Sequence, residues 1–324
     1  MPGYLKEHLT IKSITMRNIF SSYSSTCFKA FLMSTLVLST IRNDLKAQDT
    51  SATAAPVVKS KSYVKNTFGS NYLIDDQTVM VPIKKTFEFY IMHQFGTVNQ
   101  GISNFYGVFE QANMQFAMTY VPVKDLQLGF GFGNYNMEVN GNVKYAILKQ
   151  TKNGSMPVSI TYYGLAVMNT TKASTTNYIV NTADRFSYFN QILIARKINE
   201  KLSLQAGISM THYNNVPGYY DSAGKIQSQM QNNNWTFCAG GRYQLSPGTA
   251  IIVDFDQPLT QNAMNNPHPN ISFGFEFSTS GHDFQIFAGN YGYTMPTDNT
   301  FFNQNDYKQG QFLIGFIISR LWNF

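Results

Sequence analysis

The stretch Gln311-Phe-Leu-Ile-Gly-Phe-Ile-Ile-Ser-Arg-Leu-Trp-Asn-Phe324 decides the fold of this chain. In an extended strand, successive side chains point to opposite faces. One parity collects six large apolar residues: Phe312, Ile314, Phe316, Ile318, Trp322 and Phe324. The sequence therefore predicts a β-strand with one continuous apolar face.

The composition extends this reading to the whole chain. Of its 324 residues, 13% are charged and 15% are aromatic, whereas about 25% of the residues in an ordinary soluble protein are charged. No uninterrupted apolar run approaches the roughly 18 residues that a membrane-spanning helix needs. These features fit a barrel with an apolar outward face and a polar inward face.

Alternation of apolar and polar residues predicts twelve strands. In the clearest, Leu202–Thr211, five apolar side chains face one way and five small or polar residues the other. The other expected strands are Thr86–Phe95, Met114–Val121, Leu126–Gly133, Glu138–Gln150, Val158–Met168, Ser187–Lys197, Trp235–Leu245, Thr249–Asp256, Ile271–Ser278, His282–Tyr291 and Gln311–Phe324.

The connections alternate in length. Those after the even-numbered strands are short and turn-like, and those after the odd-numbered strands are long and polar, except near Asn134–Met137. An even strand count with both ends on the short-turn side is the topology of bacterial outer-membrane barrels. We therefore expect short periplasmic turns, long extracellular loops, and recognition of Phe324 on the last strand by the barrel insertion machinery.

Alternation alone leaves open which face is outside. A soluble barrel, sandwich or propeller would turn its apolar faces inward. Twelve strands, however, enclose a lumen wider than side chains can fill, since about eight strands is the limit. The polar faces are also rich in Gly, Ser, Thr and Gln rather than Lys and Glu. An all-β antiparallel transmembrane barrel in contact with outer-membrane lipid is favoured.

Residues 1–47 are predicted to be a cleaved signal peptide. The short apolar core Ala30–Ile41 follows Arg17 and Lys29, and Ala47 suits a cleavage site. A membrane-anchoring helix is the alternative, but about 12 residues are too few to span. This segment holds six basic and two acidic residues, so it carries +4 of the formal +6 charge and leaves +2 for residues 48–324. Nothing in that balance predicts a nucleic-acid partner.

Residues 48–85 are expected to precede the barrel on the periplasmic side. Ser51–Val58 is small, Pro-containing and expected to be flexible, while Phe68–Ile83 is more apolar. We expect the second part to pack in the periplasmic mouth and to plug the barrel in part. The barrel itself is assigned to residues 86–324.

Strand parity places six charged residues on the lumen side. They are Glu88, Lys144, Arg242, Asp254, Asp256 and Glu276. Two interpretations remain open for them. They can form structural ion pairs that close a narrow barrel, or they can form a constriction that selects solutes by charge.

The sequence offers little that points to catalysis. No pair of histidines has a metal-ligand spacing, and only Cys238 remains after the signal peptide, which contains Cys27. We therefore predict no disulfide, cysteine metal cluster or cofactor. An outer-surface phospholipase with His93 as base is the one enzyme considered, but no serine motif accompanies it.

Several motifs resemble those of a family of outer-membrane barrels of unknown function, known mainly from Bacteroidota. Phe89-Tyr-Ile-Met-His-Gln-Phe-Gly96 is similar to its Phe-x-Ile-x-His-Arg-Phe-Gly pattern, with Gln94 in place of Arg, and Glu110 stands where the family tends to have Asp. Ser280–Ile286 and Gly315–Arg320 resemble late family motifs. The resemblance covers about residues 65–324 and implies fold and location, but no activity. It singles out residues of unknown role: His93, Gly96, His282 and Arg320.

Three functions follow as hypotheses. The first is a Gram-negative outer-membrane channel for small solutes, and the second is a non-conducting scaffold or surface component that binds an envelope protein. The third, a lipid-modifying enzyme, has the least support in the residues. The sequence names neither a solute nor a partner.

Overall fold

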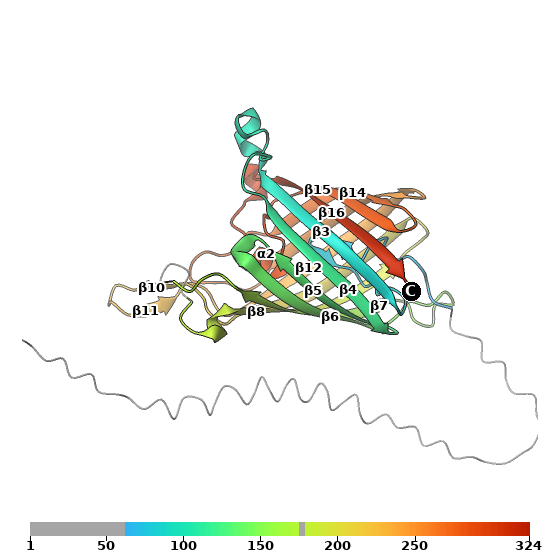
Figure 1. Ribbon diagram of the computed structural model, residues 1–324, viewed down its shortest axis with the longest axis horizontal. Helices are drawn as coiled ribbons and strands as arrows, with labels where there is room; N and C mark the ends of the chain where they lie inside the picture. The colour runs from blue at the N-terminus through green and yellow to red at the C-terminus, as the bar shows by residue number, and fades with distance from the viewer. Residues whose placement is uncertain (1–61, 175–178) are drawn as a thin grey trace, which may run out of the picture. The chain divides into compact units, whose positions relative to one another are not determined.

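The structure is a computed structural model that describes residues 62–174 and 179–324. The predicted signal peptide, residues 1–47, and the first part of the predicted periplasmic segment lie outside the described residues. From residue 86 onward, the described chain forms one large antiparallel sheet that closes on itself (Figure 1).

Twelve strands form the barrel, as the sequence predicts. Each pairs with its neighbours along the chain, and β16 pairs with β3 to close the ring. The strands are β3 (Thr86–Thr97), β4 (Asn113–Val123), β5 (Leu126–Gly133), β6 (Glu138–Leu148), β7 (Ser159–Asn169), β8 (Phe186–Lys197), β9 (Leu202–Tyr213), β12 (Asn233–Ser246), β13 (Thr249–Pro258), β14 (Asn270–Ser278), β15 (His282–Gly289) and β16 (Leu313–Asn323).

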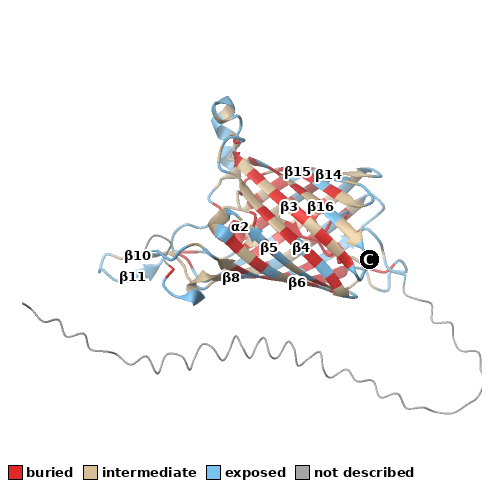
Figure 2. Cartoon of the chain, in the orientation of Figure 1, coloured by how far each residue is buried: buried red, intermediate tan, exposed pale blue. Residues whose placement is uncertain are grey.

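The apolar faces of the strands point outward. On β14, Phe273 and Phe275 are 53% and 48% exposed, whereas Ser272 and Glu276 are each 1% exposed. The same alternation gives the barrel a chequered appearance (Figure 2). A soluble barrel would show the reverse pattern, so the wall is built to face lipid. The predicted transmembrane orientation of the strands is confirmed.

Short helical segments connect or line the strands. They are η2 (Val98–Asn104), η3 (Tyr135–Met137), η4 (Thr182–Arg185), α2 (Pro296–Phe302) and η5 (Tyr307–Gln309). None of the helices in the described ranges is long and apolar enough to cross a membrane.

Two small hairpins accompany the barrel. Strands β10 (Gly218–Tyr220) and β11 (Ile226–Ser228) pair within the long connection between β9 and β12. Strands β1 (Tyr72–Leu73) and β2 (Asp76–Gln77) pair before the barrel begins. The sequence analysis did not predict either hairpin, because strands of two or three residues carry no readable alternation.

The core of the protein lies inside the barrel. The segment Phe68–Val79, which contains β1 and β2 and is called the plug below, packs against inward-facing side chains from many strands. The main cluster consists of Phe68, Tyr72, Leu73, Ile74, Val79, Tyr90, Met92, Ala117, Leu193, Ala195, Cys238, Ile252, Phe287, Tyr291 and Ile317. The lumen is therefore filled by chain that does not belong to the wall.

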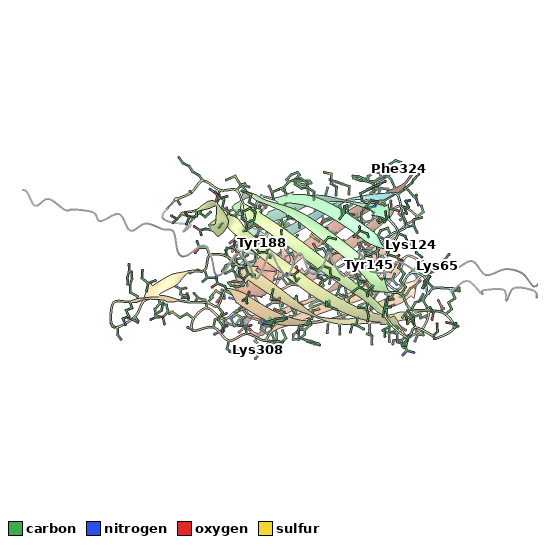
Figure 3. All side chains as sticks on the ribbon, turned by 90° about the horizontal axis from the view of Figure 1, so that it is seen from below. Lys65, Lys124, Tyr145, Tyr188, Lys308 and Phe324 are labelled. Carbon is green, nitrogen blue, oxygen red and sulfur yellow. The ribbon has the colours of Figure 1, made fainter. Side chains whose placement is uncertain are left out.

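The two ends of the barrel carry different groups. Lys65, Lys124 and Phe324 lie toward the short-turn end, whereas Lys308 belongs to a long connection at the other end (Figure 3). Arg320 is exposed on the outward face near the short turns, and its guanidinium lies 4.8 Å from the ring centroid of Trp322. A charge stacked on tryptophan suits the headgroup region of a bilayer.

The outward face provides a test of membrane depth. Phe275 lies mid-strand and Leu245 lies beside a short turn, yet both are 48% exposed. Relative to alanine at the same site, we expect Phe275→Arg to lower the free energy of unfolding in vesicles by about 2–4 kcal/mol, and Leu245→Arg by less than about 1 kcal/mol. Urea titrations of the four variants measure both differences. Equal costs at the two sites would contradict a lipid-facing wall.

Candidate functional site: the occluded lumen

Side chains of the barrel wall hold the plug in place by hydrogen bonds to its backbone. The two bonds made by Gln285 are called the Gln285 clip below. The Gln285 amide accepts from the backbone N–H of Ile74 at 3.1 Å and donates to the carbonyl of Tyr72 at 2.9 Å. Gln205 donates to the carbonyl of Gln77 at 2.7 Å, and Thr161 to that of Val79 at 3.0 Å. A two-stranded hairpin leaves its outer backbone groups unpaired, and buried groups of this kind need partners. The wall supplies them.

The tip of the hairpin is strained and fully enclosed. Ile74 has φ +58° and is 1% exposed. A β-branched residue rarely adopts a left-handed conformation unless its surroundings impose it. Here the Gln285 clip and the apolar packing impose it, so the plug has a specific seat.

Glu88 and Lys144 meet the plug on one side of the lumen. Glu88 is 1% exposed and accepts hydrogen bonds from the Asn71 amide and, at 3.4 Å, from the Thr119 hydroxyl. The Lys144 ammonium donates at 3.2 Å both to the Asn71 carbonyl and to the Gln77 side chain. Both charged side chains thus form hydrogen bonds with the same stretch of the plug.

Arg242 and Glu276 meet on the opposite side. The Nε of Arg242 lies 2.7 Å from Oε1 of Glu276, and this pair is largely buried. Gly69 of the plug crosses directly over it, since a Cβ at that position would lie only 2.2 Å from the same Oε1. Glycine therefore allows the plug backbone to approach the ion pair closely.

Asp254 and Asp256 are the last two of the six predicted lumen residues. Both are buried on the lumen face of β13, and neither forms an ion pair with another described residue. All six predicted residues thus lie on the inner face. Glu88, Lys144, Arg242 and Glu276 contact the plug or an ion-pair partner, and Asp256 lies close to Asp76 of the plug. Sequence parity placed them there but could not reveal what they touch.

A segment of a long connection also enters the lumen. In α2, Thr297, Asp298, Asn299, Thr300 and Phe301 are all buried. Tyr213 donates to Asp298 at 2.8 Å, and Asn299 donates to Asp75 of the plug at 2.7 Å. The sequence analysis treated this connection as a polar extracellular loop. It is polar because it packs against a polar lumen, not because it is solvated.

Burial changes the acidity of the carboxyl groups carried by these two inserts. Desolvation raises the pKa of Asp75, and the neighbouring charge of Asp76 raises it further. Desolvation likewise raises the pKa of Asp76 and of Asp298. The hydrogen bonds from Gln191, Asn299 and Tyr213 act in the opposite direction, because they stabilise the charged form.

The cavities that remain are separate. One of about 510 Å³ opens at the long-loop end, and among its lining residues are Tyr135, Glu138, Arg185, Tyr213 and Asp298. Another, of about 550 Å³, lies at the short-turn end beside Lys65, Lys152 and Lys197. Between the plug and α2 only about 10 Å³ is left. No residue lines two of these three spaces, so plug and α2 occlude the lumen together.

Three of the family-motif residues, His93, His282 and Arg320, point away from the lumen. His93 stacks on Phe316 at 5.0 Å between ring centroids, and its Nδ1 has no hydrogen-bond partner among the described residues. A catalytic base would need such a bond to its nucleophile or orienting residue. His282 faces Phe284 at 6.1 Å and pairs in register with Arg320. These contacts are those of outward-facing side chains near aromatic rings.

Gly96 has a structural role at the base of a long connection. The Glu110 side chain occupies the space where a Cβ on Gly96 would stand, 1.9 Å away. From there its carboxylate accepts from the backbone N–H of Thr97 at 3.0 Å and from Asn104 at 2.6 Å. The motif pairing of glycine and acidic residue thus fixes the loop that contains η2.

Comparison with known proteins agrees with this architecture. A family model described as "Membrane bound beta barrel domain (DUF5777)" matches residues 68–322. The chain belongs to this family. The match begins at the first residue of the plug, so the plug is part of the family's domain together with the barrel. The protein is a membrane-bound β-barrel of the outer-membrane type.

Solved structures resemble the protein only distantly. A NanC porin is 10% identical, with a TM-score of 0.45, and the match covers 74% of this chain and 99% of the porin. An outer membrane channel from Pseudomonas putida F1 is 12% identical, with a TM-score of 0.47, and the match covers 75% of this chain and 97% of that channel. The P. putida toluene transporter TodX is 9% identical, with a TM-score of 0.39, and the match covers 82% of this chain and 95% of the transporter. Values this low support no conclusion about activity. None of the curated proteins matches the sequence.

The Gln285 clip can be tested by hydrogen exchange. Gln285→Leu keeps the approximate volume but leaves two buried backbone groups of the plug without partners, at about 1–3 kcal/mol each. We expect the Ile74 amide to exchange at least roughly tenfold faster, since 1.4 kcal/mol is a factor of ten, while β8 and β12 stay protected. Gln127→Leu is the control, because Gln127 is a buried lumen residue that donates its hydrogen bond to Thr119 of the wall and not to the plug. Unchanged exchange at Ile74 would refute the clip.

Proposed function

We propose that the protein is an outer-membrane channel for small polar solutes whose lumen is closed by its own plug and α2. The observation that carries this proposal is the way in which the lumen is closed. The wall of the barrel does not collapse inward. Instead, two separate segments fill the lumen, and side-chain hydrogen bonds hold them there. A closure of this kind can be displaced without unfolding the strands.

The lining of the barrel supports passage of polar solutes once the plug moves. Amides and hydroxyls such as those of Gln191, Gln205, Thr211 and Gln285 face inward and are buried by the inserts. The cavity at the long-loop end joins tyrosine rings with both acidic and basic groups. Such a vestibule fits a small hydroxylated or zwitterionic solute better than an apolar one.

The location proposed is the outer membrane of a Gram-negative bacterium, of the Bacteroidota in which the resembled family is mainly known. Residues 1–47 would direct export and be removed, and the short turns would face the periplasm. The charge-poor outward face and the Arg320–Trp322 contact support insertion into lipid. No step of enzyme chemistry is proposed.

A non-conducting scaffold for an envelope partner is the second candidate. The complete filling of the lumen favours it, as does an apolar loop tip in which Ile102 and Phe109 are 74% and 80% exposed. Exposed groups of this type often mark contact surfaces.

Conductance separates the two candidates. In planar bilayers we expect the native protein to be mostly silent and Gln285→Leu combined with Gln205→Leu to open in discrete steps, because both substitutions remove hydrogen bonds that seat the plug. Gln127→Leu should remain as silent as the native protein. The doubly substituted barrel must be correctly folded, and hydrogen exchange must show that its plug is released. If this barrel still never conducts, the channel is refuted and the scaffold is supported.

A further inference from the structure

Three potential metal ligands from three parts of the chain converge beneath the hairpin. They are the carboxylate of Asp76 on the plug, the thiol of Cys238 on β12 and the carboxylate of Asp256 on β13. One ligand atom from each lies within 4.8 Å of the others. Their side chains are 4%, 0% and 2% exposed, respectively.

The fold fixes these groups in place. Cys238 and Asp256 are directly opposite each other in the β12–β13 register and share the lumen face. Asp76 approaches from the plug, and its Oδ1 accepts a hydrogen bond of 2.7 Å from Gln191. The same Gln191 nitrogen lies 3.4 Å from the Cys238 sulfur. A shared polar neighbour that orients two ligands is typical of the surroundings of metal sites.

Unpaired carboxylate oxygens give independent support. Oδ2 of Asp76 and Oδ1 of Asp254 are buried and have no hydrogen-bond partner among the described residues. Asp254 lies two residues from Asp256, on the same face of β13. Unpaired anionic oxygens in a low-dielectric interior are costly.

No positive side chain of the described residues compensates for them. In residues 62–174 and 179–324, Asp75, Asp76, Asp254 and Asp256 take part in no ion pair, and the groups that hydrogen-bond to Asp75 and Asp76 are neutral amides and the Cys238 thiol. The three carboxyl groups around the Cys238 thiol, those of Asp76, Asp254 and Asp256, therefore have no cation beside them among the described residues.

We propose that Asp76, Cys238 and Asp256 bind one divalent metal ion of the zinc type, with Asp254 available as a fourth ligand. A site that mixes thiolate with carboxylate oxygens suits zinc, whereas calcium and magnesium take oxygen ligands. Zinc holds sulfur at about 2.3 Å and carboxylate oxygen at about 2.0–2.2 Å, so the three ligands would draw closer together on binding. The Cys238 thiol gives up its proton to solvent when the metal–sulfur bond forms.

The consequence is a metal clasp between plug and wall. Asp76 belongs to the movable segment, and the other two ligands belong to fixed strands, so the bound ion holds the closed state. This consequence rests on the proposed channel function; the binding site itself does not.

Metal binding is measured on the full-length folded protein in detergent after treatment with a chelator. Zinc is titrated by calorimetry, and cadmium is added to a second sample because a cadmium–thiolate bond absorbs in the ultraviolet. We expect one ion per chain, at least about tenfold weaker binding in Asp76→Asn and Cys238→Ser, and loss of the cadmium–thiolate band in Cys238→Ser. Glu138→Gln, which removes a buried wall carboxyl at the long-loop end, should bind zinc as the native protein does.

Three results would overturn the site. They are no stoichiometric zinc binding by the native protein, zinc affinity in Asp76→Asn and Cys238→Ser equal to that of the native protein, or no cadmium–thiolate band with the native protein. Circular dichroism and heat-modified migration confirm that each variant is folded. Bilayer recordings before and after chelation then separate the two proposals. Metal binding without any conductance on chelation refutes the channel and leaves the site, whereas conductance from plug-loosened variants together with no metal binding by the native protein refutes the site and leaves the channel.

Discussion

Twelve strands enclose a lumen that the side chains of the wall cannot fill, and the rest of the structure depends on this constraint. The protein meets it by inserting two segments, the plug from the N-terminal side and α2 from a long connection. Because both inserts bring backbone polar groups into a dry interior, the wall must supply hydrogen-bond partners. The inward-facing glutamines and threonines do so.

The strengths of these contacts indicate how the closure can work. The barrel ladder is continuous and has no free edge, so opening it would cost every bond of a strand pair. The plug, in contrast, is fastened by individual side-chain hydrogen bonds, each contributing about 0.5–1.5 kcal/mol net, together with its apolar cluster. A strained Ile74 at the tip lowers the cost of leaving the seat. The plug is thus more readily displaced than a strand of the wall.

Sequence alone predicted the barrel well because its signal repeats. Period-2 alternation located all twelve strands, and its parity placed Glu88 and Glu276 on the inner face. The strand ends shifted by a few residues where pairing continues past the alternation, as at Asn233 opposite His212. The apolar run Phe68–Ile83 was expected to plug the barrel in part, but its hairpin escaped prediction, since β1 and β2 are too short to show a period. The insert α2 escaped prediction altogether, because it is polar like a solvated loop. Inside this barrel, polarity marks burial, which reverses the usual rule.

The candidate site depended even more on three-dimensional contacts. Asp76 lies about half the chain away from Cys238 and Asp256, so no spacing rule could connect the three residues. The adjacent acidic residues Asp75 and Asp76, set among apolar neighbours, were the only local sign of an unusual environment. The short contacts of Gly69 and Gly96 were likewise invisible without the structure.

The central claim is that the plug occupies the lumen of the folded protein, and Cys238 reports on it directly. This native thiol lies on the lumen face of β12 and is 0% exposed with the plug in place. The measurement is the rate at which a small water-soluble maleimide labels Cys238 in the folded protein, followed by mass spectrometry of the labelled peptide. A seated plug predicts that Cys238 stays unlabelled until the protein is denatured. Complete labelling within minutes in the folded barrel would show an open lumen and contradict this account.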